Sequence, residues 1–220
     1  MNQNNLSTFS TKKVIAIGLF CLLISFVTSA SSNSTILVMG DSLSAEYGIS
    51  RGSGWVKLLE GQLQKQGSQW QAFNASISGE TSAGGLARFE ALLLKKKPGI
   101  VLVELGANDA LRGLSIDETE KNLRKMIQLS KKSGAKVLLF GMQIPPNYGQ
   151  DYTKKFKDLY PKLASQEEIE LVPFFLAGVV SNKDLFQADN IHPNEKAQTI
   201  LYTNVWGAMA PYQSLINGNK

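Results

Sequence analysis

The sequence is poor in the residue types that most often bind metals and carry redox chemistry. It has one cysteine, Cys21, and one histidine, His192. Zinc sites are usually built from several cysteine and histidine ligands, so this composition argues against a metal centre of that kind. Because Cys21 lies in an apolar stretch near the N-terminus, the rest of the chain has to fold without disulfides. Nothing in the sequence implies any other cofactor.

A strong charge of one sign is also missing. The chain carries 23 basic and 18 acidic residues, which gives a net charge of +5. So mild an imbalance does not indicate a nucleic-acid-binding protein. There is no internal repeat, no low-complexity segment and no linker, so we expect a single domain that works as a monomer on a small-molecule substrate.

The first thirty residues differ from the rest. Lys12 and Lys13 precede the apolar run "VIAIGLFCLLISFV", and Thr28 and Ala30 are small residues placed as in a cleavage site. This pattern is typical of a secretory signal peptide, so we predict a signal peptide at 1–30, cleavage after Ala30 and one domain over 31–220. The alternative is an uncleaved N-terminal anchor, although the apolar run is short for a bilayer span. We therefore expect a periplasmic or secreted protein without a stable membrane anchor.

Beyond residue 30, apolar runs alternate with amphipathic segments. We predict strands at 35–40, 70–76, 99–106, 135–142 and 169–175, and helices at 54–67, 83–97, 117–134, 151–166 and 192–212. Pro161 is expected to kink or break its helix. Alternating strands and helices, with strands rich in Val, Leu and Ile, predict an α/β fold with a parallel sheet covered on both faces.

The residues that could carry chemistry follow the predicted strands. "GDS" with Ser42 follows the first strand, Gly79 lies after the second, Asn108 lies after the third, and Asp189 and His192 lie beyond the last. In open α/β sheets, ligands bind beyond the carboxyl ends of the strands, so these five residues are expected to share one site.

These residue types suit acyl transfer. A serine such as Ser42 needs a base, and His192 is the only histidine available. Asp189, three residues earlier, can orient its imidazole. The backbone N–H groups of Ser42 and Gly79 and the side-chain amide of Asn108 could bind an oxyanion. Taken singly, each residue has another interpretation. Ser42 could be a helix N-cap, and His192 could begin a helix. Gly79, Asn108 and Asp189 could be turn residues.

Together the blocks are far more specific. "GDSLS", "NASISGETS", "GAND" and "DNIHPN" occur in this order, and through them the chain resembles the SGNH hydrolases, or GDSL esterase/lipase family. Within that family it is most similar to the periplasmic multifunctional thioesterase, lysophospholipase and arylesterase enzymes. The resemblance implies a flavodoxin-like three-layer α/β/α sandwich with strand order 2-1-3-4-5.

The resemblance also implies an activity. It assigns Ser42 as nucleophile, His192 as base, Asp189 as its orienting acid, and Ser42, Gly79 and Asn108 as the oxyanion hole. The expected function is an exported serine esterase acting on acyl esters, thioesters or lysophospholipids, without metal or cofactor. Apolar residues after the fourth strand, Met142, Ile144, Pro145 and Pro146, could line an acyl groove or simply form rigid surface. The alternatives are a carbohydrate O-acetylesterase of the same fold and a non-catalytic module that binds a phosphate-bearing ligand.

Overall fold

The computed structural model describes residues 34–218. The predicted signal peptide at 1–30 and its cleavage site after Ala30 lie outside these described residues. Within residues 34–218, no helix combines the length and the apolar character needed to cross a bilayer.

Five parallel strands form the central sheet, in the order β2-β1-β3-β4-β5. The middle strands β1 and β3 are buried almost throughout, because helices cover both faces of the sheet. Continuous runs of Ile, Val and Leu suit such strands, since neither face meets water. The strands are β1 (Thr35–Gly40), β2 (Gln71–Asn74), β3 (Ile100–Glu104), β4 (Lys136–Phe140) and β5 (Glu170–Val172).

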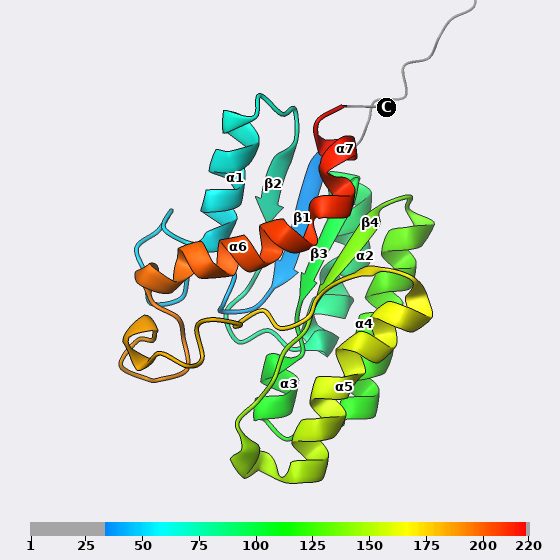
Figure 1. The fold of residues 1–220 in the computed structure, drawn as a ribbon. Helices are drawn as coiled ribbons and strands as arrows, with labels where there is room; N and C mark the ends of the chain where they lie inside the picture. The colour runs from blue at the N-terminus through cyan, green and yellow to red at the C-terminus, as the bar shows by residue number, and fades with distance from the viewer. Residues whose placement is uncertain (1–33, 219–220) are drawn as a thin grey trace, which may run out of the picture. The chain divides into compact units, whose positions relative to one another are not determined.

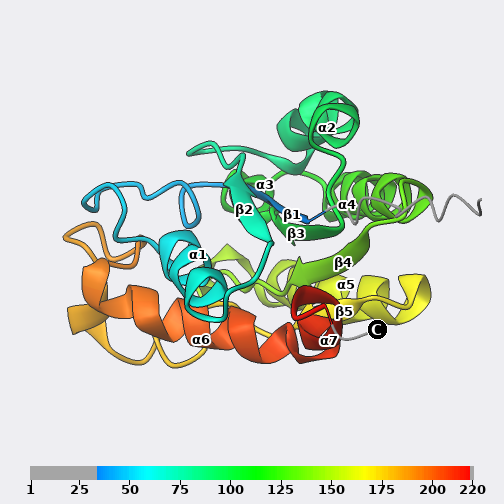
Figure 2. The same cartoon turned by 90° about the horizontal axis from the view of Figure 1, so that it is seen from above.

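Two groups of helices sandwich the sheet (Figures 1 and 2). On one face lie α1 (Trp55–Lys65) and α6 (Gln198–Ala208), followed by the short α7 (Gln213–Ile216). On the other face α4 packs between α2 and α5, and their bounds are α2 (Ser82–Lys96), α4 (Ile116–Lys132) and α5 (Gln150–Glu167). This architecture confirms the predicted three-layer α/β/α sandwich.

Local chemistry explains where the long helices begin. Thr81 caps α2 by accepting a hydrogen bond from the N–H of Gly84, and Ser115 caps α4 by accepting one from the N–H of Glu118. In α4, acidic residues occupy the first turn and lysines the last, which complements the helix dipole. The prediction for Pro161 was a kink or a break, and the α5 helix runs through this residue without a break. Pro161 lies on the exposed side, where water can satisfy the carbonyl that loses its partner.

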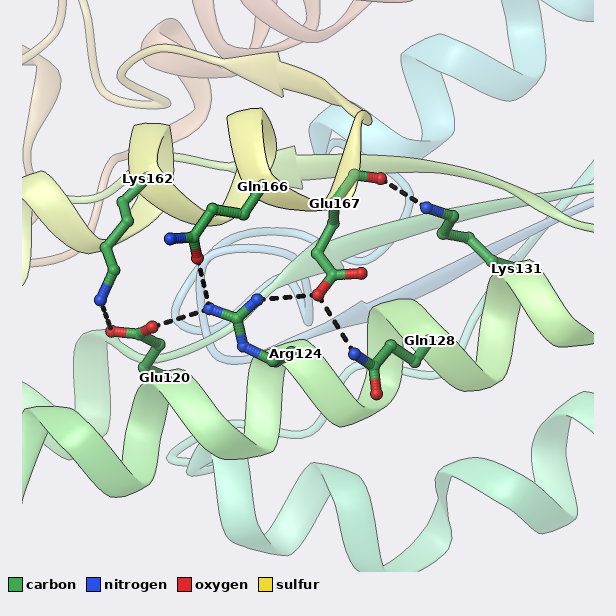
Figure 3. A network of polar contacts seen from close by, with 7 residues as sticks. All are labelled: Glu120, Arg124, Gln128, Lys131, Lys162, Gln166 and Glu167. Atoms are coloured by element: carbon green, nitrogen blue, oxygen red, sulfur yellow. Dashed lines mark hydrogen bonds and ion pairs between the residues drawn. The ribbon is translucent and has the colours of Figure 1, made fainter.

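A network of polar side chains joins α4 to α5 (Figure 3). Its centre is Arg124, whose guanidinium contacts Glu120 in its own helix and Glu167 in α5, both at 2.8 Å. Lys162 of α5 binds Glu120 in turn, at 2.9 Å. Single exposed ion pairs contribute little, but one guanidinium shared between two carboxylates fixes how the helices are aligned. Gln128, Lys131 and Gln166 complete the network.

The strand order creates a switch point between β1 and β3. From β1 the chain crosses to β2 on one side, and it then returns to β3 on the other side. Loops leaving β1 and β3 therefore diverge and leave room for a ligand at the carboxyl edge of the sheet. The short helix α3 (Ala107–Leu111) lies beyond the arrowheads of these two strands (Figure 1).

Candidate active site

Ser42 lies in the turn that follows β1. The carbonyl of Asp41 accepts a hydrogen bond from the N–H of Ala45 at 2.9 Å, which closes this turn. The next helix, α1, begins only at Trp55, so Ser42 caps no helix. The N-cap alternative for Ser42 therefore does not hold, and its hydroxyl is available for other contacts.

A continuous chain of hydrogen bonds connects Ser42, His192 and Asp189. Ser42 Oγ lies 3.0 Å from His192 Nε2, and His192 Nδ1 lies 2.7 Å from Asp189 Oδ2. An ionised carboxylate only accepts hydrogen bonds, so the ring proton belongs on Nδ1. His192 Nε2 is then free to accept the proton of the serine hydroxyl. The structure thus brings together three residues whose sequence positions span 150 residues.

A tight local turn holds Asp189 against the ring. Its Oδ1 accepts hydrogen bonds from the backbone N–H groups of Ile191 and His192, at 2.9 and 3.0 Å. Asn190, which follows Asp189 directly, adopts a left-handed conformation with φ of 56°. Burial acts to raise the pKa of Asp189, but hydrogen bonds from His192 and Ile191 outweigh it and lower the pKa to about 2. Asp189 is therefore anionic throughout the neutral range.

The sequence suggested that a helix begins at His192, but the structure shows no helix there. The helical segment starts with a 3-10 turn at Glu195–Ala197, and α6 begins at Gln198. Before it, the chain is extended: Pro193 forms an isolated antiparallel bridge with Phe186, and the His192 carbonyl accepts from the N–H of Gln187 at 2.8 Å. Because Asp189 and this bridge take up the backbone groups, the loop cannot continue as helix.

The backbone N–H groups of two predicted site residues are unused. Within residues 34–218, the N–H groups of Ser42 and Gly79 donate no hydrogen bond to the protein. Gly79 has φ of 78°, a conformation that glycine adopts without strain. Its carbonyl accepts from Arg112 Nη2 at 2.7 Å, which fixes the orientation of its peptide group. Unpaired N–H groups held this way can bind developing negative charge.

Asn108 lies in α3, a helix that the sequence did not reveal. Its side-chain amide donates to Asp41 Oδ2 at 2.9 Å, and Asn108 lines the same cavity as Ser42 and His192. Gly79 is not among the residues that line this cavity. The structure therefore groups four of the five predicted residues directly, and the place of Gly79 in the site stays a prediction.

Four residues of the site were missed in the sequence. Asp41 and Glu104 are buried beneath Ser42, Arg112 holds Gly79, and Tyr47 packs its ring on His192 with centroids 4.5 Å apart. An acid at the end of the otherwise apolar run "GIVLVELG" was the one available signal for Glu104. A buried acid in a strand needs a special environment. Nothing in the sequence pairs Arg112 or Tyr47 with its partner.

A cavity of about 850 Å³ opens beside Ser42 and His192. The loop after β4 contributes apolar residues to it, which agrees with the first of the two interpretations given for that loop. Further apolar residues come from the turn after β1, from α3 and from the segment after β5. One cation, Lys183, also lines it. The apolar lining comprises Leu43, Ala107, Leu111, Met142, Ile144, Pro145, Pro146, Phe174, Leu176, Val180, Phe186 and Ile191. No cluster of three or more potential metal ligands occurs in the described part of the chain.

A hydroxyl, an imidazole and a carboxylate joined in this order, at the carboxyl edge of a parallel sheet and beside an apolar cavity, are what acyl transfer to water requires. The class of protein so defined is a hydrolase of ester-type bonds. Comparison with known proteins gives the family. The chain belongs to the GDSL-like lipase/acylhydrolase family, whose model matches residues 38–200, and it is a carboxylic ester hydrolase.

Individual relatives agree with this membership. Esterase TesA of Pseudomonas aeruginosa is 48% identical over 191 residues, which are 87% of this chain and 95% of that protein. Thioesterase 1/protease 1/lysophospholipase L1 of Escherichia coli is 44% identical over 183 residues, or 83% of this chain and 86% of that protein. The solved structure of esterase EstA from Pseudoalteromonas sp. superposes with a TM-score of 0.78 at 39% identity, covering 82% of this chain and 99% of that chain.

Proposed function

We propose that the protein is an exported serine esterase that hydrolyses acyl esters and thioesters through Ser42, His192 and Asp189. The observation that carries this proposal is the pair of contacts made by the one imidazole. It lies 3.0 Å from the Ser42 hydroxyl and 2.7 Å from the Asp189 carboxylate. This leaves a basic nitrogen facing the hydroxyl and an anion behind the ring, as proton transfer in acyl transfer requires.

In the first half of the reaction, Ser42 Oγ attacks the acyl carbon while its proton moves to His192 Nε2. Asp189 stabilises the resulting imidazolium. As the tetrahedral intermediate collapses, the bond to the alcohol or thiol breaks, and the leaving group takes the proton from Nε2. In the second half, His192 removes a proton from water, which attacks the acyl-serine. Ser42 then recovers its proton and the carboxylic acid departs.

The negative charge on the carbonyl oxygen needs donors at each tetrahedral stage. The free backbone N–H groups of Ser42 and Gly79 and the amide of Asn108 supply them. These donors are fixed before the substrate arrives, so little reorganisation is needed when the charge develops. Loss of one such donor typically lowers the rate by about 10²–10³-fold.

The cavity suggests the substrate class. Its apolar lining suits a fatty acyl chain better than a sugar, and its volume of about 850 Å³ is in the range of small-molecule sites. The names of the relatives include esterase, thioesterase and lysophospholipase. We therefore favour acyl esters, thioesters and lysophospholipids as substrates, with arylesters as convenient reporters.

Export is part of this proposal. The segment at 1–30 directs secretion or passage to the periplasm, cleavage occurs after Ala30, and 31–220 acts as one monomeric domain. The mature chain contains no cysteine. It therefore has no need of oxidative folding in its final compartment.

Labelling of the serine tests the mechanism. A fluorophosphonate should modify the mature protein stoichiometrically at Ser42, and Ser42→Ala should lose both labelling and hydrolysis while keeping its circular dichroism. One relative, esterase EstA, is described as inhibited by monoethylphosphonate. The matched control is Ser50→Ala. Ser50 is an exposed serine whose hydroxyl lies 3.3 Å from Glu195 Oε1, so this variant should keep both labelling and hydrolysis. Retained turnover in folded Ser42→Ala would refute the assignment, and an unreactive wild type would favour a binding module.

A substrate panel tests the chemical class. Nitrophenyl esters and acyl thioesters from two to sixteen carbons should show activity rising from acetyl to medium-length chains, as an apolar groove requires. A preference for acetylated sugars over octanoyl esters would instead favour the carbohydrate O-acetylesterase.

A further inference from the structure

Two carboxyl groups lie buried beneath the nucleophile, and the proton transfers described above use neither of them. Asp41 is 1% exposed and Glu104 is fully buried. The register of β1 against β3 sets Gly40 beside Glu104, which brings the two acids together at the strand ends. Two adjacent ionised carboxylates in a buried site are costly, so one of them is expected to hold a proton.

Hydrogen-bond donors occupy three of the four carboxyl oxygens. Asp41 accepts from the N–H of Leu43 through Oδ1, at 3.0 Å, and from the Asn108 amide through Oδ2, at 2.9 Å. Glu104 Oε2 accepts from the N–H of Asp41 at 3.1 Å and from the Ser44 hydroxyl at 2.8 Å. In the described part of the chain, no hydrogen-bond donor reaches the fourth oxygen, Glu104 Oε1, although it is buried.

The direction of these bonds locates the missing proton. The Ser44 hydroxyl accepts from the indole N–H of Trp55 at 3.2 Å, so its own proton points to Glu104. Asp41 receives N–H donors on both oxygens, which favour its anion. Burial raises the pKa of Asp41 to about 6, so it is ionised at neutral pH. Burial raises the pKa of Glu104 well above its usual range, and the charge of Asp41 and a hydrogen bond between the two carboxyl groups raise it further. The proton therefore belongs on Glu104 Oε1.

We propose that Asp41 and Glu104 form a proton-sharing pair that positions the oxyanion hole. Glu104 is a neutral acid that donates to Asp41, and the Asp41 anion holds one N–H of Asn108. This role rests on the proposed function, because it assigns the second N–H of Asn108 to the substrate oxyanion.

The geometry explains why Asn108 needs such support. A carboxamide is planar, so fixing one of its two N–H bonds also fixes the direction of the other. The helix that carries Asn108 is only five residues long, and its N-cap residue, Gly106, makes no side-chain capping bond. The same Asp41 carboxylate also holds the N–H of Leu43, the residue after Ser42. One anion thus sets both the Asn108 amide and the turn that carries the nucleophile.

Two isosteric substitutions separate this role from simple packing. Glu104→Gln replaces the acid O–H with an amide N–H that can still donate to Asp41, so kcat should fall only about 3- to 10-fold. Asp41→Asn replaces an acceptor with a donor facing Asn108 or Leu43, so kcat should fall roughly 10²-fold while KM changes little. A loss in Glu104→Gln as large as that in Asp41→Asn would overturn the proposal.

A double-mutant cycle tests the path through Asn108. If Asp41 acts by aiming that amide, Asp41→Asn should cost much less in an Asn108→Ala background than in the wild type. Equal costs in the two backgrounds would show that Asp41 acts by another route and would overturn the positioning role.

Carboxyl carbon NMR of protein labelled at glutamate gives a readout independent of turnover. The wild type at neutral pH should show one protonated glutamate signal, which Glu104→Gln removes. Its absence from the wild type would overturn the proton assignment even if the variants do not fold. Because the signal is also expected in Ser42→Ala, failure of the hydrolase mechanism and failure of the carboxyl pair can be told apart.

Discussion

Replacing Asp189 with asparagine isolates the effect of one carboxylate on the tautomer of His192. The asparagine oxygen can still accept from the N–H groups of Ile191 and His192, so the turn should keep its shape. Its amide nitrogen then faces His192 Nδ1, where the Asp189 carboxylate lay at 2.7 Å. Since an amide N–H can only donate, the ring proton moves to Nε2 and points at Ser42. The serine then has no base.

The expected magnitude is large and falls on the chemical step. In a serine hydrolase, an imidazole held in the wrong tautomer lowers kcat by about 10⁴-fold, which corresponds to roughly 5 kcal/mol of transition-state stabilisation. KM should change little, because Asp189 does not line the substrate cavity. Steady-state kinetics with a soluble nitrophenyl ester, together with circular dichroism, measure the effect. A folded Asp189→Asn protein that keeps more than about a tenth of wild-type kcat would refute the orienting role.

The same substitution should have a small effect on stability with a defined pH dependence. The pKa of Asp189 falls from 3.8 to about 2 on folding, which corresponds to at most about 2.5 kcal/mol. Its side chain is 37% exposed, so solvent screening reduces this to about 1 kcal/mol. A lowered carboxyl pKa stabilises the fold above pH 3.8, and this contribution is lost as pH falls through 2. Urea unfolding of wild type and Asp189→Asn should therefore differ at pH 7 and converge near pH 2; a constant difference would contradict the linkage.

Three further substitutions test other parts of the structure. Arg112→Ala frees the Gly79 peptide, so kcat on a soluble ester should fall about 3- to 10-fold with KM unchanged; an unaltered kcat would dismiss the contact. Gly40→Ala places a Cβ 2.7 Å from Glu104 Oε2, so calorimetry should show a loss of about 1–3 kcal/mol; an unchanged melting temperature would show that Glu104 can move aside. Arg124→Ala removes the central ion pairs of the network between α4 and α5 and should cost about 1 kcal/mol with normal kcat; lost activity in the folded variant would contradict a purely structural network.

The number of strands could be predicted from local signals, whereas their order was predicted only through the resemblance of the motif blocks to a known family. The three central strands, β1, β3 and β4, are short runs rich in Val, Leu and Ile with glycine nearby. The blocks that follow the strands bring their polar residues to one edge. The segment 99–106 illustrates this: its core became β3, and Glu104 ends it. Element ends were less predictable, since the strands are shorter than their apolar runs.

The missed features depend on contacts between distant residues. A helix as short as α3, which begins after a left-handed Gly106, carries no periodic signal. The helix predicted from 192 fails because Asp189 and the Phe186–Pro193 bridge claim its first residues. The pairing of Asp41 with Glu104 depends on strand register, which no local pattern encodes.

The distance along the chain between Ser42 and His192 has a consequence for biosynthesis. An incompletely synthesised chain that ends before residue 192 contains the Ser42 hydroxyl but no imidazole that could activate it. The C-terminal segment has to pack onto the sheet before the two groups can meet, and the hydrogen bond from the Trp55 N–H to Gln198 helps to hold that segment in place. On the proposed mechanism, each newly made molecule stays inactive until its C-terminal part is in place, so esters that it meets before then are not hydrolysed.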